Sequence, residues 1–190
     1  MDNNKRSVIK SFCRHCEWAH RSWMMRKYLY DENPDERLLK HPHHAYFFIV
    51  LEKILQEYWI LEVVKLHDPA TQRGFDNLSV DYVLKLDGWP SNTKFKLQNL
   101  KKKMNKFSSL LTEARNKLLS HKDKDVIVTG EILGVFDEGE DEVYFKFLEN
   151  FASEAHENVL GEPFIFDDLI KNDIEVFMNT FASGFVSESN

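Results

Sequence analysis

The sequence predicts an all-α protein, an antiparallel helical bundle with additional helices at its C-terminal end. Long segments repeat apolar residues at three- and four-residue steps, as the buried face of a helix requires. Only seven Gly and five Pro occur among 190 residues, too few for a turn-rich sheet protein. No internal repeat, low-complexity tract or linker divides the chain. We therefore expect a single domain over residues 1–190, with a core at about 5–160 and a C-terminal helical extension at about 161–186.

The first two helices are expected over residues 5–30 and 42–66. The first ends where a turn-forming cluster, Asp31 to Asp35, interrupts the helical spacing. The second begins at Pro42, a residue that suits the first turn of a helix. The residues that we expect on its wide apolar face are Tyr46, Ile49, Val50, Ile54, Tyr58 and Leu61.

A loop and a short helix come next. Residues 70–77 indicate a loop, in which Gly74 permits unusual backbone angles. Residues 78–86 indicate a short helix, because Asn77 or Ser79 can accept a hydrogen bond from its first free N–H groups.

The third long helix begins at Ser91 or Asn92 and extends towards Ser120. Its apolar residues step by three and four throughout, and lysines occupy the other face. The residues of this inward stripe are Leu97, Leu100, Met104, Phe107, Leu111, Ala114 and Leu118. This helix is therefore expected to pack in the bundle and to present a basic surface.

The C-terminal part is expected to contain two further helices. Residues 125–139 hold three glycines and form either an irregular connection, which we favour, or a small hairpin. A helix over residues 141–160 stops at Gly161-Glu162-Pro163. The last helix extends over about 167–185.

Composition places the chain among ordinary folded proteins, with 43% hydrophobic and 29% charged residues. Its apolar runs are too short to span a bilayer, and its N-terminal residues lack the apolar segment of a signal peptide. The expected partners therefore do not include a membrane, and the expected location is the cytoplasm.

Charge is distributed unevenly along the chain, whose net charge is −6. Residues 92–124 carry ten basic and two acidic side chains. Residues 125–190 carry two basic and sixteen acidic side chains. A basic helix in an acidic protein is expected where a polyanion binds at one place. The alternative is that the basic helix and the acidic C-terminal part face each other.

Two chemistries meet near the end of the basic helix, in the segment Arg115-Asn116 followed by four residues and His121. Arginine offers a planar, permanently charged fork for phosphate, and histidine exchanges protons near neutral pH. On a straight helix these two side chains would differ by about 120° in direction and about 9 Å in height. A shared site therefore needs the helix to end before His121, or a second copy of the chain to contribute.

This pattern resembles that of the HEPN superfamily, which is marked by an arginine, a polar residue, a short spacer and a histidine. The order of two long helices, Asp68-Pro69, a short helix and a motif-bearing helix is similar to that of the abortive-infection U-type branch. The likeness covers about Cys16 to Gly161. It implies an all-α homodimer in which two motifs share a cleft. It also implies a metal-independent, cofactor-free endoribonuclease that acts as a toxin or phage-defence effector.

The resemblance assigns catalysis to Arg115, Asn116 and His121. His121 would move protons to or from the RNA, Arg115 would stabilise charge on the phosphorus centre, and Asn116 would orient its neighbours. The lysines expected to hold the RNA backbone are Lys101, Lys102, Lys103, Lys106, Lys117 and Lys122. A small nucleotidyltransferase is the kind of antitoxin expected as a partner. The alternatives are an inactive HEPN module that binds RNA, a nucleotide or a protein, and a plain helical interaction protein.

Metal binding is a weaker interpretation of the first helix. Cys13, Cys16 and His20 fall on one helical face, but a zinc site needs a fourth ligand. Small core residues explain the same spacing. His41, His43 and His44 indicate a solvent-facing helix start rather than a ligand group. We therefore expect no metal site.

Overall fold

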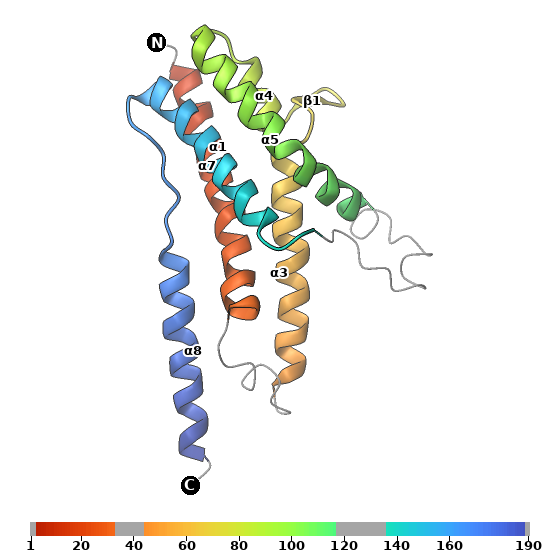
Figure 1. Ribbon diagram of the computed structural model, residues 1–190, viewed down its shortest axis with the longest axis vertical. Helices are drawn as coiled ribbons and strands as arrows, with labels where there is room; N and C mark the ends of the chain where they lie inside the picture. Colours follow the sequence, from red (N-terminus) through yellow and green to blue (C-terminus); the bar gives the residue numbers. More distant parts are fainter. Residues whose placement is uncertain (1–2, 33–43, 117–135, 189–190) are drawn as a thin grey trace. The chain divides into compact units, whose positions relative to one another are not determined.

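The computed structural model describes residues 3–32, 44–116 and 136–188, and these are helical apart from short connections and one small hairpin (Figure 1). The predicted all-α fold class is confirmed. No helix in the described ranges is long and apolar enough to cross a membrane.

The chain forms two compact units. The first unit consists of residues 1–19 and 60–166, and the second of residues 20–59 and 167–190. Helix α1 (Asn3–Arg26) and helix α3 (Ala45–Leu66) each contribute residues to both units. The expected division into a core and a C-terminal extension within one domain stays a prediction.

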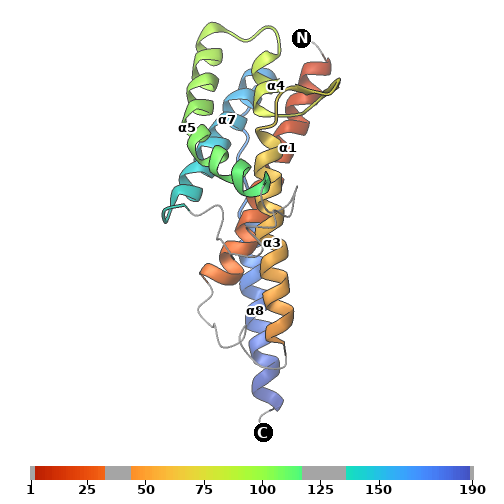
Figure 2. The same cartoon turned by 90° about the vertical axis from the view of Figure 1, so that its right-hand side faces the viewer.

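In the first unit, α5 (Ser91–Arg115) and α7 (Glu140–Leu160) lie side by side and run in opposite directions (Figures 1 and 2). The ring of Phe107 on α5 lies 5.0 Å from that of Tyr144 on α7. Phe12 of α1 contacts Phe151 of α7 edge to face, with ring centroids 5.7 Å apart. These aromatic contacts join three helices of the bundle into one apolar core.

The core confirms most of the stripe predicted for α5. Its fully or nearly fully buried members are Leu97, Met104, Phe107, Leu111 and Ala114. Leu100 is half-buried, and Leu118 lies outside the described residues. One face of α5 packs against the core, so its lysines lie on the opposite, solvent-facing side.

Local capping chemistry sets several helix ends. Helix α4 (Val80–Lys85) begins after Ser79, whose Oγ accepts a hydrogen bond from the N–H of Tyr82 at 3.3 Å, so the predicted serine cap is confirmed. Helix α7 ends at Gly161, which has a left-handed φ of 90° and donates its N–H to the carbonyl of Glu157. The other helix ends in the described ranges lie within a few residues of their predicted positions.

Two features differ from the sequence predictions, one directly after α3 and one at the end of α1. The predicted loop at residues 70–77 contains an antiparallel hairpin, β1 (Thr71–Gln72) and β2 (Phe75–Asp76). Arg73 and Gly74 both have positive φ, 52° and 84°, which is the two-residue turn that favours hairpins. The first helix also changes at Lys27–Asp31 into a π-helical segment, η1, which the helical spacing did not predict.

The second unit packs η1, the first part of α3 and α8 (Leu169–Glu188) around a small apolar cluster. Its buried members are Leu29, Phe48, Leu55 and Met178. The predicted apolar face of α3 is largely wrong: Tyr46, Ile49 and Ile54 are 80%, 62% and 56% exposed. Helix α3 carries apolar residues around its whole circumference, so their spacing does not single out the buried face.

Some predictions fall outside the described residues. These are the helix start at Pro42, the end of the third long helix near Ser120, and most of the connection at residues 125–139. The last two helices are observed at Glu140–Leu160 and Leu169–Glu188, close to the predicted ranges.

Candidate functional site at the end of helix α5

Arg115 is the last residue of α5, and its side chain points to the segment that follows α3. Its Nη2 atom lies 3.7 Å from Oδ1 of Asp68. The two side chains are 25% and 26% exposed, so the pair is accessible from one side without being fully solvated. Burial raises the pKa of Asp68, while the charges of Arg115 and Lys65 oppose that rise.

Asp68 is held in place by its neighbour His67. The Nε2 atom of His67 lies 2.9 Å from the hydroxyl of Tyr144, whose ring is buried between α5 and α7. Burial lowers the pKa of His67 to about 4, and Lys101 adds to the effect. His67 is therefore neutral at pH 7 and anchors the end of α3 to the core of the bundle.

The arginine side chain keeps hydrogen-bonding capacity. Its Nε atom is buried and has no hydrogen-bond partner among the described residues. A buried donor without an acceptor is costly, and a guanidinium has five N–H groups arranged to bind oxyanions in pairs. An anionic ligand that reached the exposed part of the guanidinium would add to the single carboxylate contact.

The other motif residues are placed only in part. Asn116 follows Arg115 with helical backbone angles and is exposed. His121 lies outside the described residues, as do Lys117 and Lys122. Whether the motif comes together in one site, as the sequence analysis expected, therefore stays a prediction.

The lysines predicted to bind RNA differ in their surroundings. Lys101 forms an ion pair with Asp81, and Lys106 forms one with Glu140. The ammonium of Lys103 lies 4.9 Å from the ring centroid of Phe147, a cation–π distance. Lys102 is exposed to solvent.

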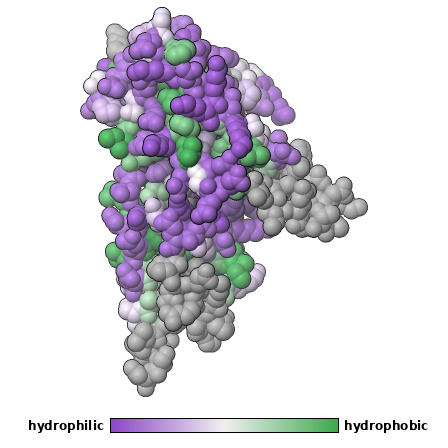
Figure 3. All heavy atoms as spheres, in the orientation of Figure 1, coloured by the Kyte–Doolittle hydropathy of each residue, from purple (hydrophilic) through white to green (hydrophobic). Residues whose placement is uncertain are grey.

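The acidic helix α7 neutralises part of the basic face of α5. Besides the Lys106–Glu140 pair, Lys96 lies 3.0 Å from Glu154. A cavity of about 500 Å³ between these helices is lined by Lys103, Lys106 and several acidic residues. The alternative in which the basic helix faces the acidic C-terminal part is thus observed for these pairs, and the visible face of the first unit is mainly hydrophilic (Figure 3).

The cysteines of α1 are part of the core. Cys13 and Cys16 are fully buried, and the Sγ of Cys13 lies 3.6 Å from the carbonyl of Ala152, to which it donates. Burial raises the pKa of Cys13 to about 12 and that of Cys16 well above its usual range. Their full burial in the apolar core fits the packing role that the helical spacing also allowed.

Sequence reasoning overlooked the roles of His67 and Asp68. In the sequence, His67-Asp68-Pro69 indicates only that a helix ends, because a histidine–aspartate pair at a helix end does not show which residues it will contact. Only the fold shows that this end meets Arg115 and Tyr144.

Comparison with known families gives one match. The family model described as AbiU2, of the HEPN type, matches residues 5–180. The match extends beyond the range of about Cys16 to Gly161 expected from the motif, and it includes most of α8. No curated protein and no solved structure matches the chain.

Proposed function

The chain belongs to the HEPN family AbiU2, and from this premise we propose that it is an endoribonuclease that cleaves RNA at the Arg115–His121 motif. The observation that carries the proposal is the partly buried guanidinium of Arg115, which has one distant carboxylate contact and a donor without a partner in the described ranges. Such a group is suited to an incoming phosphate.

The proposed reaction uses the nucleophile that RNA itself carries. A basic imidazole removes the proton of the 2′-hydroxyl, and the oxygen attacks the adjacent phosphorus atom. The bond from phosphorus to the 5′-oxygen breaks, and an acidic imidazole protonates that oxygen. The products are a 2′,3′-cyclic phosphate and a 5′-hydroxyl, and the reaction requires neither metal nor cofactor.

Three residues divide this work. His121 exchanges the protons, and in a homodimer the two copies of His121 supply one base and one acid. Arg115 stabilises the negative charge that grows on the phosphoryl oxygens, which is where a positioned cation contributes most to catalysis. Asn116 orients the imidazole or the phosphate through its amide.

Asp68 is a positioning residue in this scheme. Its carboxylate lies on the Nη2 side of Arg115 and restrains the guanidinium, while His67 and Tyr144 fix the backbone that carries it. A restrained arginine loses less side-chain rotational entropy when it binds phosphate, so the entropic cost of binding is smaller.

RNA would approach along the lysines of α5. Phosphate contacts from these side chains fix the strand without reading its sequence. Lys102 is the most available of the described lysines, whereas Lys101 and Lys106 would first exchange their carboxylate partners for phosphate. We propose the remaining lysines, Lys117 and Lys122, for the same role.

The biological role that fits this activity is that of a toxin or phage-defence effector in the cytoplasm. A toxin of this kind needs an antitoxin, and a small nucleotidyltransferase that modifies or covers the motif is the partner we propose. A second candidate function is an inactive HEPN module that binds RNA. It is favoured by the ion pairs that already occupy Lys101 and Lys106.

The test is cleavage of total RNA by the purified protein in EDTA, compared with Arg115→Ala and His121→Ala. Arg14→Ala is a matched control, because Arg14 is an exposed arginine on α1. We expect loss of cleavage in the first two variants and none in the control. Unchanged cleavage in both motif variants would remove the proposed site, while salt-sensitive RNA binding without cleavage would support the inactive module.

A further inference from the structure

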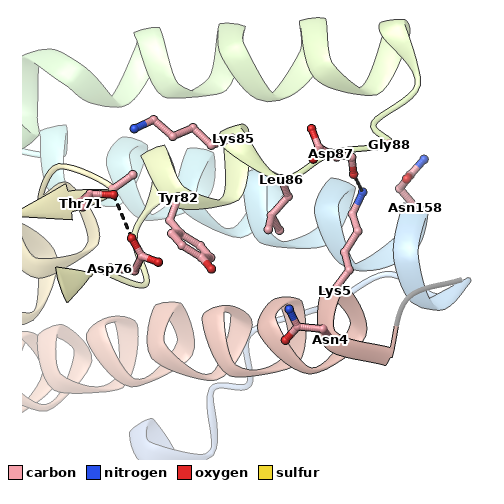
Figure 4. Close-up of a pocket in the computed structure, with 11 residues that line it drawn as sticks. Asn4, Lys5, Thr71, Asp76, Tyr82, Lys85, Leu86, Asp87, Gly88 and Asn158 are labelled. Carbon is pink, nitrogen blue, oxygen red and sulfur yellow. Dashed lines mark hydrogen bonds between the residues drawn. The ribbon is translucent and has the colours of Figure 1, made fainter. Parts of the chain in front are cut away.

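Another cavity in the first unit lies between the N-terminal turns of α1, the β1–β2 hairpin and α4 (Figure 4). Its volume is about 640 Å³, within the ~300–1,000 Å³ usual for small-molecule sites. None of the residues proposed for catalysis lines it. The polar, charged and bulky side chains that line it include Asn4, Lys5, Asp76, Tyr82, Lys85, Leu86 and Asp87.

Two acidic and two basic residues line the cavity, Asp76 and Asp87 and Lys5 and Lys85, and the geometry of Asp76 and Lys5 suits them to a ligand. Asp76 lies at the hairpin end, where its Oδ1 accepts a hydrogen bond from Thr71 at 2.9 Å (Figure 4). Lys5 lies at the other end, where its Nζ donates to the carbonyl of Asp87 at 2.6 Å. An ammonium has three donors and a carboxylate several acceptor positions, so these contacts orient both groups and leave capacity for a ligand.

Lys5 is suited to an anion. Its ammonium also lies 3.8 Å from the centroid of the Trp89 ring, which holds it against the wall of the cavity. Burial lowers the pKa of Lys5, and the charge of Asp87 only partly offsets that effect. A phosphate at this end would replace hydration that the cation has lost.

Between Asp76 and Lys5 the cavity is lined by groups suited to a flat ring. The side chain of Tyr82 projects from α4 into the space, that of Leu86 projects from the residue directly after α4, and Asn4 faces them from α1 (Figure 4). Aromatic side chains stack on nucleobases with little preference for sequence, whereas a carboxylate accepts hydrogen bonds from the exocyclic amino group of a base. Asp76 therefore supplies the selectivity that Tyr82 does not.

We propose that this cavity binds one nucleotide, with the base against Tyr82, an exocyclic amino group donating to Asp76, and the phosphate at Lys5. Adenine, guanine and cytosine carry such an amino group. Uracil has no exocyclic amino group and can offer Asp76 only its ring N–H. The carbonyl oxygens on both sides of that N–H would lie against the carboxylate and be repelled by it, so uracil should bind less tightly.

The nucleotide can come from solution or from an RNA strand, and the fold makes the second source reachable. Three residues of chain join Asp68, the partner of Arg115, to Thr71 on the rim of the cavity. This segment spans at most about 11 Å. A stacked strand advances ~3.4 Å per nucleotide, so about three nucleotides cover that distance. The RNA source rests on the proposed nuclease function, whereas the nucleotide chemistry of the cavity does not.

Calorimetric or NMR titration of the full chain with AMP, GMP, CMP and UMP in EDTA tests the proposal. We expect the first three to bind about tenfold more tightly than UMP, the value of one charge-assisted hydrogen bond. Asp76→Asn should remove this preference, because an amide both donates and accepts. Asp173→Asn, at an exposed position of α8, is the matched control.

The phosphate end has its own test. Lys5→Gln should weaken AMP binding about tenfold and leave adenosine binding unchanged. Lys10→Gln is the matched control, since Lys10 is exposed on the same helix and does not line the cavity. UMP binding to the unmodified protein as tightly as AMP would overturn the proposal even if a variant failed to fold. So would the absence of binding by all four nucleotides at millimolar concentration.

A short 2′-O-methyl RNA separates the two sources. If this uncleavable strand displaces AMP, the cavity takes its nucleotide from an RNA strand. If AMP binding is unchanged in its presence, the ligand is a free nucleotide. AMP binding by a protein that never cleaves RNA would refute the nuclease and leave the nucleotide cavity standing. Cleavage of RNA by a protein that binds none of the nucleotides would refute the nucleotide cavity and leave the nuclease proposal standing.

Discussion

Lowering the pH should destabilise the protein through His67, the residue that ties the end of α3 to Tyr144. The pKa of His67 is about 4 in the folded chain, against 6.5 for the free imidazole, because burial disfavours the charged form. Below pH 6.5 the imidazole of His67 is protonated in the unfolded chain, whereas in the folded chain it stays neutral until the pH approaches 4. Stability is therefore lost as the pH falls from about 6.5 towards 4.

The size of the effect follows from these two pKa values. Between pH 7 and pH 5, linkage predicts a loss of about 2 kcal/mol from His67 alone. His20 in the second unit also has a pKa lowered to about 4 by burial, so a comparable loss is expected there. His67→Gln should therefore reduce the stability lost between pH 7 and pH 5 by about 2 kcal/mol.

The assay is urea unfolding followed by circular dichroism at pH 5, 6 and 7, at constant ionic strength. Glutamine at position 67 does not titrate, and its amide can still bond to the hydroxyl of Tyr144. The unmodified chain should lose stability more steeply than His67→Gln as the pH is lowered. Equal slopes for the two proteins would show that His67 is not held neutral, and the anchoring role argued for it would fail.

Three other predictions concern the site and the helix ends. Asp68→Asn should slow RNA cleavage by about tenfold, because Arg115 is then less well positioned. RNA affinity should not fall, because the substitution removes a negative charge that repels RNA; a weaker affinity measured by filter binding would contradict this. Lys102→Gln should lower the salt dependence of RNA binding by about one unit of slope, and Lys106→Gln by less, because Lys106 is ion-paired; equal slopes would refute the distinction. Gly161→Ala should cost about 1–2 kcal/mol in urea unfolding, since its φ is 90°; an unchanged midpoint would count against a strained cap.

The helices were predictable from the sequence where one face is apolar and the other charged. Helix α5 is the clearest case, since Leu97, Met104 and Leu111 alternate with lysines and all three are buried. The same reasoning chose the wrong face of α3, because Phe48 and Leu55 lie among apolar neighbours that point outwards. Spacing indicates a helix, and only tertiary packing decides which side is covered.

The candidate site was predictable only in part. The motif predicts a phosphate-binding role for Arg115, but nothing near it in the sequence indicates Asp68, which lies 47 positions earlier. The hairpin after α3 was also missed, since the turn depends on Arg73 adopting a positive φ that its side chain does not favour. Contacts between distant segments arise from the fold, and no local pattern encodes them.

The central claim is that Arg115 and His121 cleave RNA with the 2′-hydroxyl as nucleophile. Mass spectrometry of the fragments released from a defined RNA in EDTA tests it most directly, with Arg115→Ala measured in parallel. The account predicts 2′,3′-cyclic phosphate and 5′-hydroxyl ends from the unmodified protein and intact RNA from the variant. Fragments with 5′-phosphate ends, or the same fragments from Arg115→Ala, would contradict it.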